Sequence, residues 1–438
     1  MKFTPNRFAA AFLAVVGLAS SVLAGDFIIH NNDRVVFLGD SITEQKLYST
    51  YIEAYSLTRH PDWKLTFRNT GWGGDTAWLR QRAHADENAL FKAEPAEQQK
   101  MVENAVKQGL ERDVLPLKPT VVTIDFAMND HSYQAFREDI FRAHVLSQNQ
   151  LTSVLKDNGA RVALLTTQPI EEKRPDPDKD IRNQSLRKFS DGLKEVAAKQ
   201  GVVFADQFDP YMAIMMRERA ANPSAFIGGG DAVHPGPAGH TIMAWAVLKG
   251  LGAEALVSRA GIDAAAKKVV TSEKCRIENL KSENGSISFD RIDEALPMPI
   301  DSRAEAALKL APILDELSRY ELVVSGLASG SYELSIDGET VGKATAEDLA
   351  RGWNLSNQSG PIKAQSQEVL KLVFKKNDVF HRRWRDVQLF SLPDWAKNAE
   401  TGRSAELARL DQEIAGLETQ IDAARKIKTH HFKLKAAQ

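Results

Sequence analysis

The chain has 438 residues, of which 43% are hydrophobic and 26% charged, and its formal net charge at pH 7 is -2. This composition is typical of a folded globular protein with two or three domains, and it excludes a disordered chain. Because the sequence has no long basic block, it also argues against nucleic acid as a partner.

Residues 1–24 have the pattern of a secretory signal peptide. Lys2 and Arg7 precede an apolar run, and small residues stand at the two positions that a signal peptidase reads. We therefore expect a mature chain that starts at Gly25 and is exported to a bacterial periplasm or the exterior. No later segment has the apolar length of a membrane span, and the single cysteine, Cys275, excludes an intrachain disulfide.

Between residues 25 and 256, short apolar runs alternate with segments of helical period. The strand-like runs are Val35–Leu38, Leu65–Arg68, Val121–Phe126, Val162–Thr166 and Val202–Phe204, and helices are expected at 43–60, 133–156 and 238–251. This alternation predicts an α/β domain in which helices cover both faces of a parallel sheet. The chemistry is then expected at the carboxyl ends of the strands.

Residues 257–394 read as a smaller, mixed accessory module. Antiparallel strands are expected at 287–289, 320–324, 332–336 and 369–374, and the Asp337-Gly338 pair is typical of a tight hairpin turn. Two roles stay open for this module. The module either has a functional role, in which it covers the active site or binds the substrate, or it has a purely structural role.

Residues 395–438 are expected to form an amphipathic helix and a tail. The apolar seam of the helix consists of Leu407, Leu410, Ile414, Leu417 and Ile421. It is short for a self-pairing coiled coil, so we expect it to pack against its own protein. For His430 and His431 no third metal ligand is identifiable, which favours a solvated tail over a metal site.

The most informative segment is Gly39-Asp40-Ser41, at the end of the first strand-like run. Ser41 stands where a helix begins, and the unpaired N–H groups and dipole of a helix start stabilise an oxyanion. A lone serine at such a junction is also an ordinary helix cap. The choice between these two interpretations depends on the rest of the chain.

Three later segments also lie where a parallel sheet collects its active site. A glycine-rich loop at 69–76 follows the second strand and brings backbone N–H groups close to a reacting carbonyl. Asn129 ends the third strand and either donates an amide N–H to an oxyanion or ties down a loop. Asp231 stands three residues before His234, so its carboxylate can fix the imidazole while the other ring nitrogen takes a serine proton.

These four segments, in this order, resemble the SGNH, or GDSL-type, hydrolase superfamily. The resemblance implies a three-layer α/β/α fold with a flavodoxin-like sheet. It implies Ser41 as nucleophile and Asp231 and His234 as its partners. The oxyanion hole would be formed by Ser41, Gly74 and Asn129. Two departures stand out, since Ile42 replaces the Leu of the motif and Ala127 stands where the third block usually has Gly.

The resemblance implies a secreted serine esterase that needs no metal and no organic cofactor. Export of such an enzyme favours a carbohydrate acetylesterase acting on an acetylated carbohydrate, with Trp72 and Trp78 as platforms for sugar rings unless they are core residues. A lipase, lysophospholipase or thioesterase of the same superfamily is the first alternative. A non-catalytic glycan-binding protein is the second, and the oligomeric state is left open.

Overall fold

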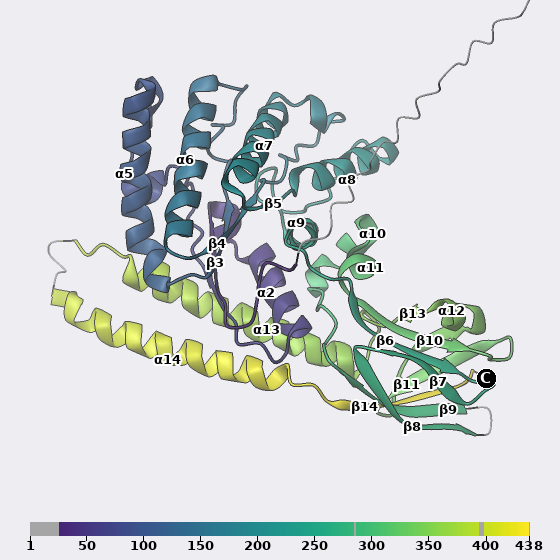
Figure 1. The fold of residues 1–438 in the computed structure, drawn as a ribbon. Coiled ribbons are helices and arrows are strands. Elements are labelled where there is room, and N and C mark those ends of the chain that lie inside the picture. Colours follow the sequence, from purple (N-terminus) through teal and green to yellow (C-terminus); the bar gives the residue numbers. More distant parts are fainter. Residues whose placement is uncertain (1–25, 284–285, 394–397, 438) are drawn as a thin grey trace, which may run out of the picture.

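The computed structural model describes residues 26–283, 286–393 and 398–437, so the expected signal peptide lies outside the described residues. Two main hydrophobic cores organise the described chain. One lies in a body built of a sheet and helices, and the other lies in a β-rich module beside it (Figure 1).

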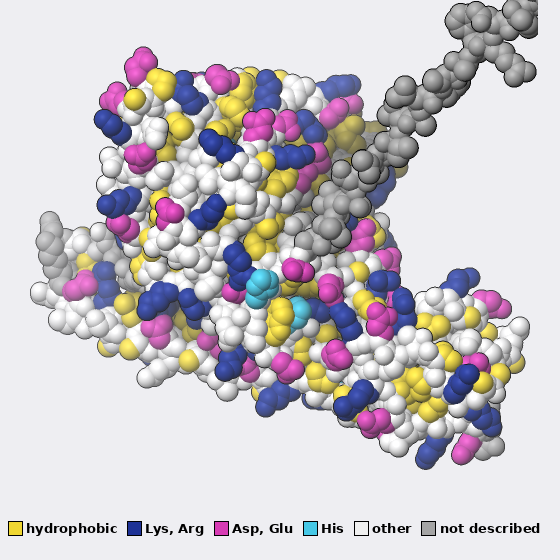
Figure 2. Space-filling model, viewed as in Figure 1, with side chains coloured by type: hydrophobic (Ala, Val, Ile, Leu, Met, Phe, Trp, Pro, Cys, Tyr) yellow, Lys and Arg dark blue, Asp and Glu magenta, His cyan; other side chains and the backbone are white. Residues whose placement is uncertain are grey.

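The surface carries mixed charge. Basic and acidic side chains are interspersed over the face drawn in Figure 2, in keeping with the net charge of -2. Within the residues that the structure describes, no helix combines the length and the apolar character of a membrane span.

Five parallel strands form the sheet of the first body, in the order β2-β1-β3-β4-β5. They are β1 (Arg34–Gly39), β2 (Thr66–Asn69), β3 (Val121–Asp125), β4 (Arg161–Leu165) and β5 (Val203–Ala205). All five expected strands are therefore present, because short apolar runs such as the fully buried β3 suit a sheet covered on both faces. The order is flavodoxin-like and confirms the predicted α/β/α fold, whose strand order reverses between β1 and β3.

Helices on the two faces of the sheet complete the layers (Figure 1). Helix α5 (Pro95–Asp113) packs on α6 (Glu138–Asp157), which packs on α7 (Ile181–Gln200), and α2 (Leu47–Arg59) packs on α9 (Pro237–Gly250) and α13 (Pro361–His381). The other helices of this body are three short ones, α1 (Ser41–Glu44), α3 (Arg80–Ala83) and α4 (Glu87–Lys92), and the longer α8 (Phe208–Ala221).

Two expected helices differ from the observed ones, and in both cases a left-handed backbone is part of the cause. The helix expected at 43–60 is divided into α1 and α2 by Lys46, whose φ is +63°. The helix expected at 133–156 begins only at Glu138, because Tyr133 has a φ of +55° and Arg137, directly before the helix, has an extended backbone. A right-handed helix cannot continue through such residues.

The β-rich module contains two sheets, ordered β13-β10-β6-β7 and β12-β11-β14-β9-β8. Its strands are β6 (Leu256–Asp263), β7 (Lys268–Glu273), β8 (Cys275–Glu283), β9 (Ser286–Asp293), β10 (Arg319–Ser325), β11 (Ser331–Ile336), β12 (Glu339–Thr345) and β13 (Trp353–Asn354). The short helices α10 (Ala307–Leu310), α11 (Ile313–Leu317) and α12 (Ala346–Arg351) lie between them. The predicted hairpin turn joins β11 and β12, with positive φ at both Asp337 and Gly338.

The strand expected at 369–374 is wrong, because these residues lie in α13. Pro361 begins the helix, and its buried positions recur every three or four residues, including Val369, Leu370 and Val373. This face packs on the sheet body rather than on the β-rich module. Within that contact Lys376 donates to Glu53 at 2.7 Å, and both side chains are buried.

The C-terminal segment is more ordered than the sequence indicates. Helix α14 (Glu400–Ala424) buries Leu410, Ile414, Leu417 and Ile421 and packs along α13, as its seam predicts. The expected solvated tail is wrong. Residues Thr429–Ala436 form β14, which pairs with β9 on one side and β11 on the other. His430 and His431 are paired with Asp337 and Asp290 across these strands.

Because β14 fills the middle of its sheet, the last residues should be essential for the stability of the module. Phe432 is fully buried and stacks on Phe289 with ring centroids 5.1 Å apart. Phe432→Ala should lower the free energy of unfolding by about 3–5 kcal/mol. Phe390→Ala, at a side chain that is 53% exposed, is the control and should stay within about 0.5 kcal/mol in the same denaturant titration. Equal effects of the two substitutions would contradict the central position of β14.

Candidate active site

Ser41 lies at the start of α1, directly after β1. The Asp40 side chain caps the helix by accepting the Ile42 N–H at 2.9 Å. Gly39 leaves room for this sharp turn, because an added Cβ would lie 2.6 Å from the Asp125 carbonyl oxygen of the neighbouring strand. The Ser41 backbone N–H has no acceptor among the described residues, so it is free for an incoming negative charge.

His234 reaches Ser41 from a loop 193 residues further along the chain. Its Nε2 lies 2.8 Å from the Ser41 Oγ, and its Nδ1 lies 3.2 Å from the Asp231 Oδ2. Burial raises the pKa of Asp231, but hydrogen bonds from the His234 and Val233 N–H groups outweigh it, and the pKa lies below its ordinary value. Asp231 is therefore a carboxylate that can hold the imidazole in one orientation.

The loop that carries His234 is tied to the residues after β4. Glu171 accepts the Ile227 and Gly228 N–H groups at 2.6 and 2.8 Å. Gln168 donates to the Val233 carbonyl oxygen at 2.8 Å. Sequence reasoning missed both residues. The signal that points to them is their position, since Gln168 and Glu171 are polar yet buried just past the carboxyl end of a strand.

The glycine-rich loop lies against the start of α1. An added Cβ at Gly73 would be 4.0 Å from the Ser41 Cβ, so this loop borders Ser41. Gly74 has φ of +75°, and its N–H has no acceptor among the described residues. A buried ion pair fixes the loop, because Arg82 donates to Asp75 at 2.7 Å and to the Thr70 carbonyl oxygen.

Asn129 contacts the same loop from the end of β3. Its Nδ2 donates to the Asp75 carbonyl oxygen at 2.9 Å, directly after Gly74, and its Oδ1 accepts from the Tyr133 hydroxyl at 3.0 Å. One of the two Nδ2 hydrogens therefore stays unused in the protein. The structure thus brings Ser41, Gly74, Asn129, Asp231 and His234 to one edge of the sheet.

The two tryptophans expected as sugar platforms behave differently. Trp78 is only 1% exposed and donates its Nε1 hydrogen to Glu87 at 2.9 Å, so its expected role as a platform is wrong and it is a core residue. Trp72 is half-buried, and the Arg385 guanidinium covers its ring at 4.0 Å from the centroid. The residues after α13 therefore already occupy one face of Trp72.

Two buried carboxyl groups, those of Asp40 and Asp125, lie close to Ser41. Burial, and then the charge of Asp125, raises the pKa of Asp40 well above its ordinary value. Burial also raises the pKa of Asp125 to about 8, although a hydrogen bond from Gln207 opposes this shift. Both shifts favour the protonated form of these two carboxyl groups.

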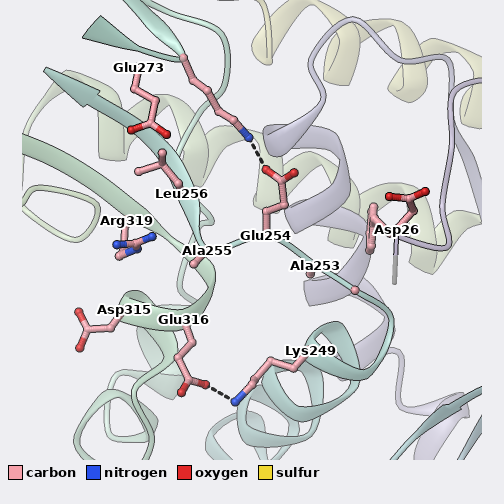
Figure 3. A pocket seen from close by; sticks show the side chains of 13 residues that line it. Asp26, Lys249, Ala253, Glu254, Ala255, Leu256, Glu273, Asp315, Glu316 and Arg319 are labelled. Carbon is pink, nitrogen blue, oxygen red and sulfur yellow. Dashed lines mark hydrogen bonds and ion pairs between the residues drawn. The ribbon is translucent and has the colours of Figure 1, made fainter. Parts of the chain in front are cut away.

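A cavity of ≈ 1100 Å³ lies elsewhere, between the sheet body and the β-rich module (Figure 3). Its wall includes two ion pairs, Lys249 with Glu316 and Lys274 with Glu254. None of the lining residues belongs to the Ser41 site. The constellation around Ser41, rather than this cavity, has the groups that acyl transfer requires.

Comparison with known proteins agrees with this geometry. Residues 37–242 match the GDSL-like Lipase/Acylhydrolase family. Among solved structures the chain is similar to "BT4096 a gut microbial diltiazem-metabolizing enzyme", with 26% sequence identity and a TM-score of 0.75 over 93% of this chain and 98% of that chain. A comparison with curated proteins gives no match.

Two further similarities are limited to about half of the chain. Axe2, an acetylxylan esterase from Geobacillus stearothermophilus, is 20% identical, with a TM-score of 0.40 over 52% of this chain and 97% of that chain. LAE5, an alpha/beta hydrolase enzyme from the metagenome of Lake Arreo in Spain, is also 20% identical, with a TM-score of 0.40 over 52% of this chain and 98% of that chain.

The match of residues 37–242 to the GDSL-like lipase/acylhydrolase family confirms the resemblance of this part of the chain to the SGNH hydrolases. The protein is therefore a hydrolase that acts on ester bonds.

Ala127, which stands where the family resemblance expects glycine, has a strained backbone. Its φ is +116°, a value that favours glycine, while its N–H is held by Asp130. Glycine would remove the strain there without losing this hydrogen bond.

Ala127→Gly should therefore raise the free energy of unfolding by about 1 kcal/mol, as relief of strain exceeds the entropy lost by glycine. Ala143→Gly is the matched control. It makes the same change inside α6, where φ is helical, and should lower the stability by about 1 kcal/mol or more. Thermal and denaturant unfolding of both variants measure the difference, and a loss of stability in both would contradict the strain at Ala127.

Proposed function

We propose that the protein is a serine esterase that works through an acyl-enzyme, with Ser41 as nucleophile and His234 as general base. The observation that carries this proposal is the 2.8 Å hydrogen bond between the Ser41 Oγ and the His234 Nε2. In the first step His234 takes the hydroxyl proton as Ser41 attacks the ester carbonyl. His234 then gives this proton to the leaving alcohol, and the acyl group stays on Ser41.

The negative charge of the tetrahedral intermediate would be held by three donors: the Ser41 N–H, the Gly74 N–H and the free hydrogen of the Asn129 amide. In the second step water attacks the acyl-enzyme while His234 takes a proton from it, the bond between the acyl group and the Ser41 Oγ breaks, and His234 returns the proton to this oxygen as the acid leaves. Asp231 orients His234 throughout and stabilises the imidazolium without taking the proton itself. Every proton moves between Ser41, His234, substrate and water, so the scheme requires no metal ion and no organic cofactor.

We further propose that the substrate is an acetylated carbohydrate outside the cytoplasm. The site opens to solvent, because the His234 side chain is 34% exposed and that of Asp231 67%. An open site suits a small acyl group on a bulky alcohol, whereas a long acyl chain needs a deep apolar pocket. Tyr133, 40% exposed and bonded to Asn129, offers an aromatic face beside the site. The proposal that the protein is exported rests only on the signal-peptide pattern of residues 1–24.

The two alternatives make different demands on the chain. A lipase, lysophospholipase or thioesterase would use the same five residues and would differ only in the acyl chain that it accepts. A non-catalytic glycan-binding protein would not need a histidine ring that lies 2.8 Å from the Ser41 hydroxyl and is held there by Asp231. This arrangement therefore argues against the second alternative.

The nucleophile is tested by Ser41→Ala. The variant should stay folded and lose at least about a thousandfold in kcat/KM for p-nitrophenyl acetate, because no other group can carry the acyl intermediate. Ser190→Ala is the matched control. It removes a hydroxyl that only bonds the Leu186 carbonyl oxygen within α7, and it should keep full activity. Near-normal hydrolysis by a folded Ser41→Ala variant would refute the mechanism.

The substrate class is tested by a series of nitrophenyl esters from acetyl to palmitoyl, followed by acetylated polysaccharides with release of acetate as the readout. An acetylesterase should turn over the shortest esters best and release acetate from the polysaccharides. Diltiazem belongs in the same panel, because a similar structure that covers 93% of this chain is that of a diltiazem-metabolizing enzyme. A preference for long acyl chains would favour the lipase alternative, and glycan binding without any turnover would favour the binding protein.

A further inference from the structure

We propose that Tyr133 is a positioning residue of the oxyanion site, which acts by holding and polarising the Asn129 amide through its hydroxyl. The proposal rests on the function proposed above, because it assigns a role within the same acyl-transfer site. Tyr133 was not among the site residues that the sequence indicated. It lies in a turn between β3 and α6 that the sequence reads as the start of a helix.

The Asn129 amide is held at both ends. Its Nδ2 donates to the Asp75 carbonyl oxygen at 2.9 Å, and its Oδ1 accepts from the Tyr133 hydroxyl at 3.0 Å. If the amide were rotated by half a turn, the Oδ1 would face the Asp75 carbonyl oxygen, and two acceptors would meet. Only one orientation therefore satisfies both neighbours. That orientation leaves the second Nδ2 hydrogen for the oxyanion.

The hydrogen bond that the Asn129 Oδ1 accepts from Tyr133 also makes the Asn129 Nδ2–H a stronger donor. When an oxyanion accepts the amide hydrogen, electron density in the amide shifts toward the Oδ1, and a hydrogen bond to that oxygen stabilises the shift. Asn129 is only 8% exposed, so water has little access to replace the Tyr133 hydroxyl. The benefit is largest in the transition state, because the charge on the oxyanion develops there.

The backbone conformation around Tyr133 places its hydroxyl at the Asn129 Oδ1. Ser132 and Tyr133 both have φ of +55°, a conformation that bulky side chains rarely adopt. The Tyr133 ring packs against the buried His131, with centroids 5.1 Å apart, yet it stays 40% exposed. Burial and the negative charge of Asp40 raise the pKa of Tyr133 to about 12, so the hydroxyl keeps its proton and remains a donor near neutral pH.

The first test is Tyr133→Phe, which keeps the ring and removes only the hydroxyl. With p-nitrophenyl acetate, kcat should fall about tenfold while KM stays within about twofold, because the lost interaction strengthens in the transition state. Tyr332→Phe is the matched control. It removes a hydroxyl that bonds the Ala328 carbonyl oxygen at 2.9 Å in the β-rich module, and it should leave kcat unchanged. Thermal unfolding checks that both variants are folded.

The second test is a double-mutant cycle with Asn129→Ala. If Tyr133 acts through Asn129, Tyr133→Phe should cause no further loss of kcat once the amide is gone. The proposal is overturned if Tyr133→Phe alone keeps full kcat, or if it costs the same factor with and without Asn129. These failures are distinct from a failure of the proposed function, which would appear as ester hydrolysis retained by Ser41→Ala.

Discussion

The hydrogen bond between Ser41 and His234 is the interaction on which the whole site depends, and the parallel sheet makes it possible. Ser41 leaves the sheet at the end of β1, and Asn129 leaves it at the end of β3, on either side of the point where the strand order reverses. His234 belongs to no strand. It is brought to Ser41 by the hydrogen bonds of Glu171 and Gln168, which tie its loop to the residues after β4. The position of His234 is therefore set by residues that follow a strand two places away from the one that carries Ser41.

One part of the C-terminal half of the chain, the segment that follows α13, reaches the border of this site. Helix α13 docks on the sheet body through the buried Lys376–Glu53 pair, and the residues that follow it carry Arg385 onto the Trp72 ring. Arg385 also lies 3.7 Å from Glu44, which accepts the Gly73 N–H beside the nucleophile. The last strand, β14, then returns to the centre of the β-rich module. Helices α13 and α14 thus connect the border of the active site with the core of the module (Figure 1).

The strands of the sheet and the four chemical segments were predictable, because a buried parallel strand is a short apolar run and its carboxyl end carries the site residues. Each expectation that the structure corrects has a physical cause. Positive φ occurs at Lys46, Ser132 and Tyr133, and the residue types at these positions do not predict it. The run 369–374 is apolar apart from Lys371, so only the spacing of apolar residues over the longer segment 361–381 indicates α13. Burial of Trp78 and the tether by Glu171 depend on long-range packing, which a single sequence does not display.

Covalent labelling tests the central claim most directly, because it reports the nucleophile and its activation together. The protein would be treated with a fluorophosphonate, which reacts with serines that a neighbouring base activates, and the modified peptide identified by mass spectrometry. The account predicts one rapid adduct, on Ser41, and a rate of labelling that falls at least about a hundredfold in His234→Ala. An adduct on a different serine, or equally fast labelling of Ser41 without the imidazole, would contradict it.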